Sequence, residues 1–247
     1  MHAHERHQQL EDLLSKQGTI IVSEVARKWK VSEMTIRRDL AQLAASGLVA
    51  RVHGGAMAQG SLRWSDRADR FQAAKMRAVR KLADCLNEGS SFYLDGSTTV
   101  AGLIPLLAKR RDIVVATCNI DTFQRLVTCP GLMPLLIGGE LNRRTDNFGG
   151  PVSRLALESL TFDTAFFSAY GLHPEFGLSD PEQDDAEIKR LVCKRSRRQA
   201  IAVSHDKLGL SAAGAWMPNK ENSILATDLN PIDQRLFAFQ SLFQSIL

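Results

Sequence analysis

The sequence has few cysteines and no long apolar run, and both absences narrow the class of protein. The cysteines are Cys85, Cys118, Cys129 and Cys193. They form no C-x-x-C pair and have no histidine at zinc-ligand spacing, so we expect reduced thiols and neither a metal nor a cofactor. No segment approaches the ~18 apolar residues of a membrane span, and His2–Glu11 lacks the apolar core of a signal peptide. These absences predict a cytoplasmic protein without membrane contacts.

A strong excess of one charge is also missing. The 31 Lys and Arg residues oppose 27 Asp and Glu residues, and the net charge of +4 permits nucleic-acid binding without demonstrating it. Basic residues gather between Arg63 and Lys81, but such a run is most often the solvated face of a helix. With 44% hydrophobic residues among 247, the composition is that of a soluble globule, and the length favours two domains.

Residues 1–57 show the apolar spacing of three short helices, with side chains repeating at i, i+3 and i+4. The inward positions are Leu10, Leu13, Leu14, Val25, Ala26, Trp29, Ile36, Leu40 and Leu43. Ser23 and Ser32 stand at the expected N-caps of the second and third helices. The β-branched run 48–52 and the pair Gly54-Gly55, which allows positive φ, then predict a small wing. The segment is therefore predicted to be a winged helix-turn-helix.

The rest of the chain has the pattern of an α/β domain. A polar, Arg-rich stretch over 58–75 predicts a linker to a second domain over 76–247, which starts with a helix over 76–86. Strand candidates occur at 91–94, 112–116, 133–137, 163–169, 199–204 and 223–226. Helical stretches separate several of them, so we expect a mostly parallel sheet with helices on both faces. The tail, 235–247, is apolar but irregular, and its pattern fits either a helix or a strand.

The start of the third helix carries groups suited to reading DNA. If its apolar stripe faces the core, the intervening residues point outward near the end that a recognition helix inserts into the major groove. Arginine can bond guanine through two hydrogen bonds, and threonine can touch a thymine methyl group. The alternative is that the two arginines are ordinary exposed residues, one of them paired with Glu33 or Asp39. The candidate DNA contacts are Ser23, Met34, Thr35, Arg37 and Arg38, and in the wing Arg51, His53, Gly54 and Gly55.

The segment after the first strand of the second domain combines glycine with three hydroxyl groups. Backbone amides and hydroxyls at the start of a helix suit a phosphate, although a serine- and threonine-rich N-cap without a ligand is an equal alternative. Other glycine, amide and hydroxyl groups follow later strands, at the edge where open α/β sheets bind ligands, and a lysine joins them there. The candidate effector contacts on this ground are Gly96, Ser97, Thr98, Thr99, Asn119, Gly138, Gly139, Tyr170, Gly171 and Lys207.

Motifs in both halves of the chain resemble one known family. They are Val31-Ser-Glu-Met-Thr-Ile-Arg-Arg-Asp-Leu40, Arg51-Val-His-Gly-Gly-Ala56, Leu94-Asp-Gly-Ser-Thr-Thr99 and His205-Asp-Lys-Leu-Gly209. Together they resemble the DeoR family of bacterial transcriptional regulators, over nearly the whole chain. The resemblance implies that Ser32, Thr35, Arg37 and Arg38 face DNA beside the wing residues, and that the second domain is similar in fold to ribose-5-phosphate isomerase.

The resemblance also implies a phosphorylated sugar as the effector. Lys207 and the Gly96–Thr99 loop would hold the phosphate, with Asp95, Asn119, Tyr170 and Lys189 as further contacts. The chain departs from the family pattern in two places. Val203-Ser-His-Asp precedes Lys207 where relatives more often carry aspartate and serine, and the final residues lack the apolar strand that usually closes the domain.

These patterns predict a repressor of a sugar-metabolism operon that a phosphorylated sugar releases from its operator DNA. We expect a homo-oligomer, a dimer or tetramer, because one winged helix makes few contacts and paired half-sites multiply affinity. An activator is one alternative. An isomerase or hydrolase is another, with Asp95 and the acidic run 180–185 as the only obvious bases, and we expect no catalysis. A ligand-free architectural DNA-binding protein would leave the loops of the second domain without purpose.

Overall fold

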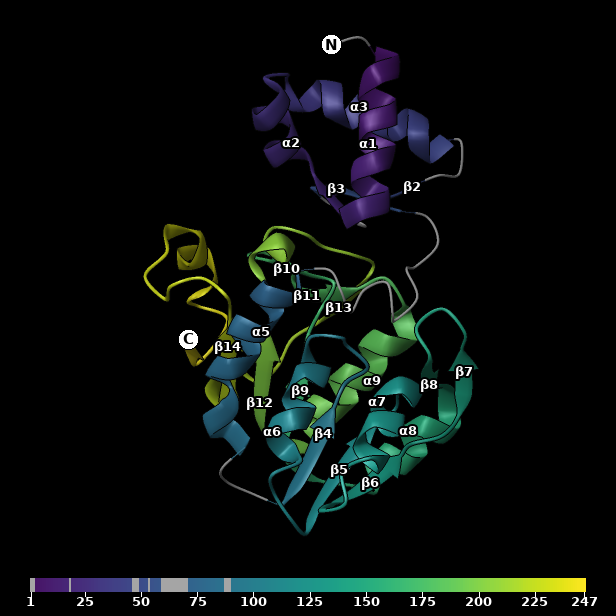
Figure 1. The fold of residues 1–247 in the computed structure, drawn as a ribbon, viewed down its shortest axis with the longest axis vertical. Helices are drawn as coiled ribbons and strands as arrows, with labels where there is room; N and C mark the ends of the chain where they lie inside the picture. Colours follow the sequence, from purple (N-terminus) through teal and green to yellow (C-terminus); the bar gives the residue numbers. More distant parts are fainter. Residues whose placement is uncertain (1–2, 18, 46–48, 53, 59–70, 87–89) are drawn as a thin grey trace.

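The computed structural model describes residues 3–17, 19–45, 49–52, 54–58, 71–86 and 90–247 (Figure 1). A small helical unit, drawn in purple, comes first along the chain, and a larger unit of strands and helices follows it. No helix within these ranges is both long enough and apolar enough to cross a membrane.

The first unit is the predicted arrangement of three helices and a wing. Its elements are α1 (Ala3–Gln17), β1 (Thr19–Ile21), α2 (Val22–Trp29), α3 (Glu33–Ala45), β2 (Val49–Val52) and β3 (Gly55–Ala58). The strands form an antiparallel sheet in the order β1-β3-β2. Leu10, Ile36 and Leu40 are buried in one shared core, so the predicted apolar stripes face inward.

Two local predictions in this unit are wrong. Helix α2 begins at Val22, and its N-cap Ile21 makes no side-chain cap bond, so Ser23 lies inside the helix instead of capping it. Of the two wing glycines, only Gly54 has a positive φ, of 81°. Gly55 belongs to β3, where a Cβ would lie 1.9 Å from the Ile20 carbonyl oxygen. Its lack of a side chain therefore serves strand packing and not turn formation.

The second unit is built on a seven-stranded sheet in which every pairing is parallel. Its strands are β4 (Ser91–Leu94), β5 (Ile113–Thr117), β6 (Leu132–Leu136), β9 (Phe162–Phe167), β12 (Ser196–Ala202), β14 (Ser223–Ala226) and β15 (Ser245–Ile246), in the order β15-β14-β12-β9-β4-β5-β6. The six predicted segments supply six of them, which confirms the α/β fold. The seventh comes from the tail, so the prediction that the chain lacks a closing strand is wrong.

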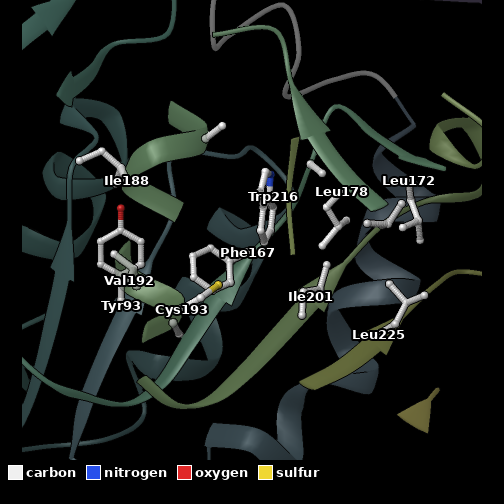
Figure 2. Close-up of a cluster of buried hydrophobic side chains, with 14 of the residues drawn as sticks. Tyr93, Phe167, Leu172, Leu178, Ile188, Val192, Cys193, Ile201, Trp216 and Leu225 are labelled. Carbon is white, nitrogen blue, oxygen red and sulfur yellow. The ribbon is translucent and has the colours of Figure 1, made fainter. Parts of the chain in front are cut away.

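Side chains from the two faces of the sheet enter two separate cores, as expected when both faces are covered. Along β4, Phe92 and Leu94 join one core and Tyr93 joins the other. The helices are α5 (Gln72–Lys81), α6 (Ile104–Leu107) and α7 (Ile120–Val127) on the first side, and α8 (Gly150–Glu158) and α9 (Gln183–Lys194) on the second. Figure 2 shows part of the second core, where Trp216 packs against Phe167.

Smaller elements surround the main sheet. Five further strands form two small antiparallel sheets, β7 (Glu140–Asn142) with β8 (Asn147–Gly149), and β10 (Gly171–His173) with β11 (Gly177–Asp180) and β13 (Gly214–Trp216). The short 3-10 helices are η1 (Ala83–Leu86), η2 (Val100–Leu103), η3 (His205–Lys207), η4 (Lys220–Asn222) and η5 (Gln234–Phe239). The sequence pattern predicted none of the small strands.

Helix α5 begins earlier than the sequence pattern suggests. It starts at Gln72, inside the predicted linker over 58–75, so residues 72–75 are helical. It ends at Lys81, and the remainder of the predicted helix forms the 3-10 turn η1. The rest of the predicted linker, residues 59–70, lies outside the described residues. Because α5 starts at Gln72, Lys75 belongs to this helix and is buried.

Candidate DNA interface and effector site

The N-terminal end of α3 presents polar side chains to the solvent. Ser32 caps the helix as predicted, because its Oγ accepts a hydrogen bond from the Thr35 amide at 3.1 Å. The Met34 side chain is 68% exposed, and Arg37 and Arg38 are exposed as well. The outward orientation predicted from the apolar stripe is therefore confirmed.

One of the two arginines has a partner along the helix. Arg37 Nη2 lies 3.1 Å from Glu33 Oε2, in the i, i+4 arrangement that the sequence offered as an alternative. Both side chains are about half exposed, and such pairs contribute only a few tenths of a kcal/mol. The pair therefore leaves Arg37 available to a stronger partner, such as a base edge or a phosphate.

A buried carboxylate fixes α3 against α1. Asp39 Oδ2 accepts a hydrogen bond from Arg6 Nε at 2.7 Å, and its Oδ1 accepts from Arg6 Nη2 at 3.2 Å and lies 3.3 Å from His7 Nε2. Asp39 is 3% exposed, so it is not the partner of an exposed arginine on its own helix, which was one of the alternatives. Asp39 therefore positions α3 against α1, and its own side chain does not face the solvent.

The wing follows α3 as predicted. Arg51 lies on β2 opposite Ala56, and Gly54 forms the turn between β2 and β3. His53 lies outside the described residues. The backbone of the wing therefore matches the predicted DNA-contacting arrangement.

In the second unit, one carboxylate ties together the loops after two neighbouring strands. Asp95 follows β4, and its Oδ1 accepts a hydrogen bond from the Ser97 amide at 2.9 Å. Its Oδ2 accepts from the amide of Ser168, which follows β9, at 2.8 Å. Because β4 and β9 are adjacent and parallel, these loops meet at the carboxyl edge of the sheet, where ligands of such folds bind.

Lys189, on α9, is held by two carboxylates at this edge. Its Nζ lies 2.7 Å from Asp180 Oδ2 and 3.4 Å from Asp95 Oδ2, and it also donates to the Ser168 carbonyl at 2.7 Å. Burial alone would lower the pKa of Lys189, but the two carboxylates raise it overall. Trp216 Nε1 donates to the same Asp180 oxygen at 2.7 Å. The charge of Lys189 is thus balanced by two carboxylates of the protein. Its contacts hold the loops after β4 and β9 and the strand β11 together.

Lys207 is in a different situation. It lies in the loop after β12, the strand next to β9, and its Nζ donates to Ser168 Oγ at 3.0 Å. Within the described part of the chain, no carboxylate lies at ion-pair distance from it. Burial lowers its pKa, as expected for an ammonium group removed from water. A cation placed this way favours the arrival of an anion.

Three hydroxyl groups close to these residues in sequence lack hydrogen-bond partners. Among the described residues, no group bonds Thr99 Oγ1, Ser204 Oγ or the Tyr170 hydroxyl, and all three atoms are buried. Burial also raises the pKa of Tyr170. Buried polar atoms are nearly always paired, so their unused capacity is consistent with a polar ligand at this edge.

A small cavity opens beside the Gly96–Thr99 loop. Its lining includes Asp95, Gly96, Asn147, Asp185 and Lys189. Burial raises the pKa of Asp185 to about 6, which places its titration close to physiological pH. Neither Asn147 nor Asp185 was predicted as a contact individually, because Asn147 belongs to a short hairpin and Asp185 to a run of acidic residues.

Several predicted contacts have structural roles within the protein. The Asn119 amide nitrogen donates to Thr145 O, Asp146 O and Asn147 Oδ1, which commits both of its hydrogens to the loop of the β7–β8 hairpin. Protein atoms also fill the space beside three of the predicted glycines. An added Cβ would lie 2.1 Å from Asn147 Oδ1 at Gly96, 2.1 Å from Ser153 Oγ at Gly139 and 2.3 Å from Leu210 O at Gly171. These three positions therefore need glycine because of neighbouring protein atoms, and among the four predicted glycines only Gly138 has open space beside it.

Comparison with known families matches both units. Residues 6–61 match the DeoR-like helix-turn-helix domain, and residues 70–229 match the DeoR C terminal sensor domain. The chain belongs to the DeoR family.

Three related proteins align with this chain over most of the length of both partners. The chain is 30% identical over 228 residues to the uncharacterized HTH-type transcriptional regulator FruR of Bacillus subtilis (strain 168), covering 91% of this chain and 90% of that protein. It is 28% identical over 211 residues to the glycerol-3-phosphate regulon repressor of Escherichia coli (strain K12), covering 84% of each. It is 28% identical over 241 residues to the lactose phosphotransferase system repressor of Streptococcus mutans serotype c, covering 95% of each.

Solved structures are more distant. A D-ribose-5-phosphate isomerase in complex with phospho-erythronic acid shares 14% identity over 56% of this chain and 54% of that one, with a TM-score of 0.41. At that score the likeness supports no argument about chemistry. The functional assignment therefore depends on the family and on the geometry of the two sites.

Proposed function

We propose that this DeoR-family protein is a transcriptional repressor of a sugar-metabolism operon. The N-terminus of α3 and the wing bind operator DNA, and a phosphorylated sugar bound at the carboxyl edge of the large sheet releases the protein. The first step is supported by the side chains at the start of α3. Met34, Arg37 and Arg38 are exposed there, and Thr35 is partly exposed. Relatives that are named as repressors of a glycerol-3-phosphate regulon and of a lactose phosphotransferase system support the second.

The observation that carries the effector proposal is the contrast between two lysines at one edge of the sheet, the buried Lys189 and the partly buried Lys207. Lys189 has two carboxylate partners, whereas Lys207 has a hydroxyl partner at Ser168 and none of the described carboxylates at ion-pair distance. The phosphate of a sugar phosphate supplies the missing negative charge. The amides and hydroxyls of Ser97–Thr99 complete the phosphate site, and Tyr170 and Asp185 reach the sugar hydroxyls.

A catalytic role has less support. The carboxylates considered as bases were Asp95 and the acidic run 180–185, and of these Asp95 and Asp180 accept hydrogen bonds from Lys189 or from backbone and indole N–H groups. These two carboxylates are already engaged by protein donors, so they are poorly placed to take a proton from a substrate. We therefore propose that the site binds its sugar phosphate without turnover, and product analysis after long incubation checks this.

The direct test is an operator titration with and without a panel of phosphorylated sugars. We expect one of them to lower the operator affinity of the wild-type protein. Lys207→Met should bind the operator normally but no longer respond. Lys109→Met, which removes an exposed lysine after α6, is the matched control and should respond like wild type. Equal operator affinity of the wild-type protein with every compound in the panel would reject the proposal.

We also propose that the protein binds its operator as a homo-oligomer, through two or more half-sites, and that the effector changes the arrangement of the DNA-binding units. Analytical ultracentrifugation of the free protein and of its operator complex measures the stoichiometry. A monomer bound to one half-site with full affinity would contradict this part of the proposal.

A further inference from the structure

Asp185 is a carboxylate without a cationic partner in the small cavity beside the Gly96–Thr99 loop. Lys189 lines the same cavity, but Asp95 and Asp180 already balance its charge, at 3.4 and 2.7 Å. In the part of the chain that the structure describes, no lysine, arginine or histidine lies at ion-pair distance from Asp185. This carboxylate therefore adds a negative charge to the cavity that no neighbouring cation balances.

An amide of the β7–β8 hairpin supports the charged form of Asp185. Asn147 Oδ1 accepts a hydrogen bond from Asn119 Nδ2 at 2.8 Å, which leaves the Asn147 nitrogen to donate to Asp185. Burial raises the pKa of Asp185 to about 6, although the Lys189 charge and the Asn147 hydrogen bond favour the ionised form. Above that pH the group is mainly a carboxylate, which accepts hydrogen bonds and donates none.

The two ends of the proposed effector site therefore differ in charge. Lys207 donates to Ser168 Oγ at 3.0 Å and has no described carboxylate at ion-pair distance, so its end attracts a phosphate. Asp185 attracts hydrogen-bond donors at the other end. Lys189 and Asp180 interact electrostatically with both Lys207 and Asp185. A ligand that spans the site thus places its phosphate at Lys207 and its donors at Asp185.

We propose that Asp185 selects the sugar part of the effector by charge. The protein then binds phosphate esters whose other groups are hydroxyls, and it rejects esters that also carry a carboxylate, such as the phosphates of aldonic acids. This inference rests on the proposed function of the site. Hydroxyl groups donate to the Asp185 carboxylate, whereas a second carboxylate would lie beside a negative charge that nothing balances.

The alternative is that Asp185 has only a structural role. It lies in the first turn of α9, where a negative charge stabilises the end of the helix. A structural role changes the affinity for all ligands alike, whereas a selecting carboxylate changes the ratio of two affinities. Asp184 lies in the same turn and is exposed, so Asp184→Asn removes the same charge without altering the cavity lining.

The experiment is isothermal titration of the full-length protein with matched pairs of acyclic phosphate esters. Each pair differs only in whether one terminal group is a CH2OH group or a carboxylate. The pairs are glycerol 3-phosphate with 3-phosphoglycerate, ribitol 5-phosphate with 5-phosphoribonate, and glucitol 6-phosphate with 6-phosphogluconate. Inorganic phosphate probes the Lys207 end alone.

At pH 8 the wild-type protein should bind the hydroxyl member of a pair about ten-fold more tightly or better, because like charges in contact are unfavourable. Asp185→Asn should lose most of this preference, chiefly by binding the carboxylate member more tightly. Asp184→Asn should keep the preference of the wild type within about two-fold, because this exposed charge is screened by solvent. Thermal unfolding of both variants shows whether they are folded.

The wild-type protein supplies a second readout that needs no substitution. Its preference should be smaller at pH 5 than at pH 8, because Asp185 loses its charge below about pH 6. Both members of a pair carry the same phosphate, so its own titration cancels in the ratio. Burial raises the pKa of Tyr93 and of Cys118, so both stay neutral over this range. The other charged side chains around Asp185 are Asp95, Asp180, Glu182, Lys189 and, paired with Glu182, Arg144 of the hairpin.

Equal affinity of the wild-type protein for both members of every pair would overturn the inference, as would an unchanged preference in Asp185→Asn. An equal change for inorganic phosphate and for both members of a pair would assign Asp185 the structural role. Binding of inorganic phosphate without any ester would also reject selection at Asp185, while leaving the phosphate end in place. If the protein binds neither inorganic phosphate nor any ester, the proposed effector class fails together with this inference.

Discussion

At the scale of single residues, neighbouring charges have different roles. Asp39 and Arg38 are adjacent in sequence, but the first is buried against Arg6 and the second faces solvent. Lys189 and Lys207 both donate to Ser168, but among the described residues only Lys189 has carboxylates at ion-pair distance. The type of residue therefore does not decide its role, and the partners within the fold do.

The exposed arginines of α3 give the first prediction. Arg37→Ala and Arg38→Ala should each lower operator affinity by about 1–3 kcal/mol if a base contact is lost, because no other group of the helix start replaces a guanidinium. Fluorescence anisotropy at two salt concentrations separates a base contact from a phosphate contact. Arg143→Ala, on an exposed residue of the β7–β8 hairpin, is the control. Unchanged affinity in both variants would remove α3 from the proposed interface.

Asp185 gives a prediction about pH. Its pKa in the folded protein, about 6, lies above the value near ~3.9 of an unfolded chain. Between these values the folded state binds more protons, so the free energy of unfolding falls as pH rises from about 4 to about 6, by on the order of 3 kcal/mol at most. Asp185→Asn removes this slope. Urea unfolding at several pH values measures it, with the exposed Asp184→Asn as the control. If the free energy of unfolding depended on pH in the same way for Asp185→Asn and wild type, Asp185 would not be the source of the slope.

At the scale of elements, the sequence predicted the helices and strands that have a periodic apolar pattern. It missed the short strands, which form through pairing with distant segments. The six strands at 91–94 and onward are apolar runs, and each forms a strand of the parallel sheet. The strands β7, β8, β10, β11 and β13 have three or four residues each, so they are too short to show a pattern. The start of α5 could not be predicted from the sequence, because the polar residues before it continue into its first turn.

The site was predictable to a similar degree. The Gly96–Thr99 loop and Lys207, which we propose as phosphate-binding groups, stand out as local motifs in the sequence. The partners of Lys189 and the role of Asn119 depend on residues 9 to 94 positions away, such as Asp180, Asp95 and Thr145. No local pattern carries that information. Lys75 shows the same limit, because its bond to Thr98 joins two segments 23 residues apart.

The wing gives a prediction at this scale. Gly55→Ala should destabilise the first unit by about 1–3 kcal/mol, because the new methyl group would lie 1.9 Å from the Ile20 carbonyl oxygen and would force β1 and β3 apart. Operator affinity should fall with it. Gly138→Ala is the matched control, since a Cβ there meets no atom within 4 Å. Chemical unfolding followed by circular dichroism measures both, and equal stability of Gly55→Ala and wild type would contradict the packing argument.

At the scale of the whole molecule, the proposed effector site joins loops from Gly96 to Lys207 that meet only in the folded sheet. A ligand of this site should therefore bind the folded state alone. The phosphate ester that releases the operator should raise the free energy of unfolding by about 2.7 kcal/mol at 100 times its dissociation constant. Differential scanning fluorimetry measures the shift, and Lys207→Met should abolish it. A shift that persists in Lys207→Met would place the ligand elsewhere.

The first unit has a hydrophobic core of its own, made of residues from Leu10 to Ala56, which is separate from the two cores of the large sheet. In genetic terms, this separation gives the proposed repressor two opposite classes of mutant. Changes at Lys207 leave the operator-binding core intact and should yield a strain whose operon no sugar can induce. Changes at Arg38 or Gly55 should yield a strain whose operon is always expressed. A collection of such mutants would therefore divide along the chain at residues 59–70.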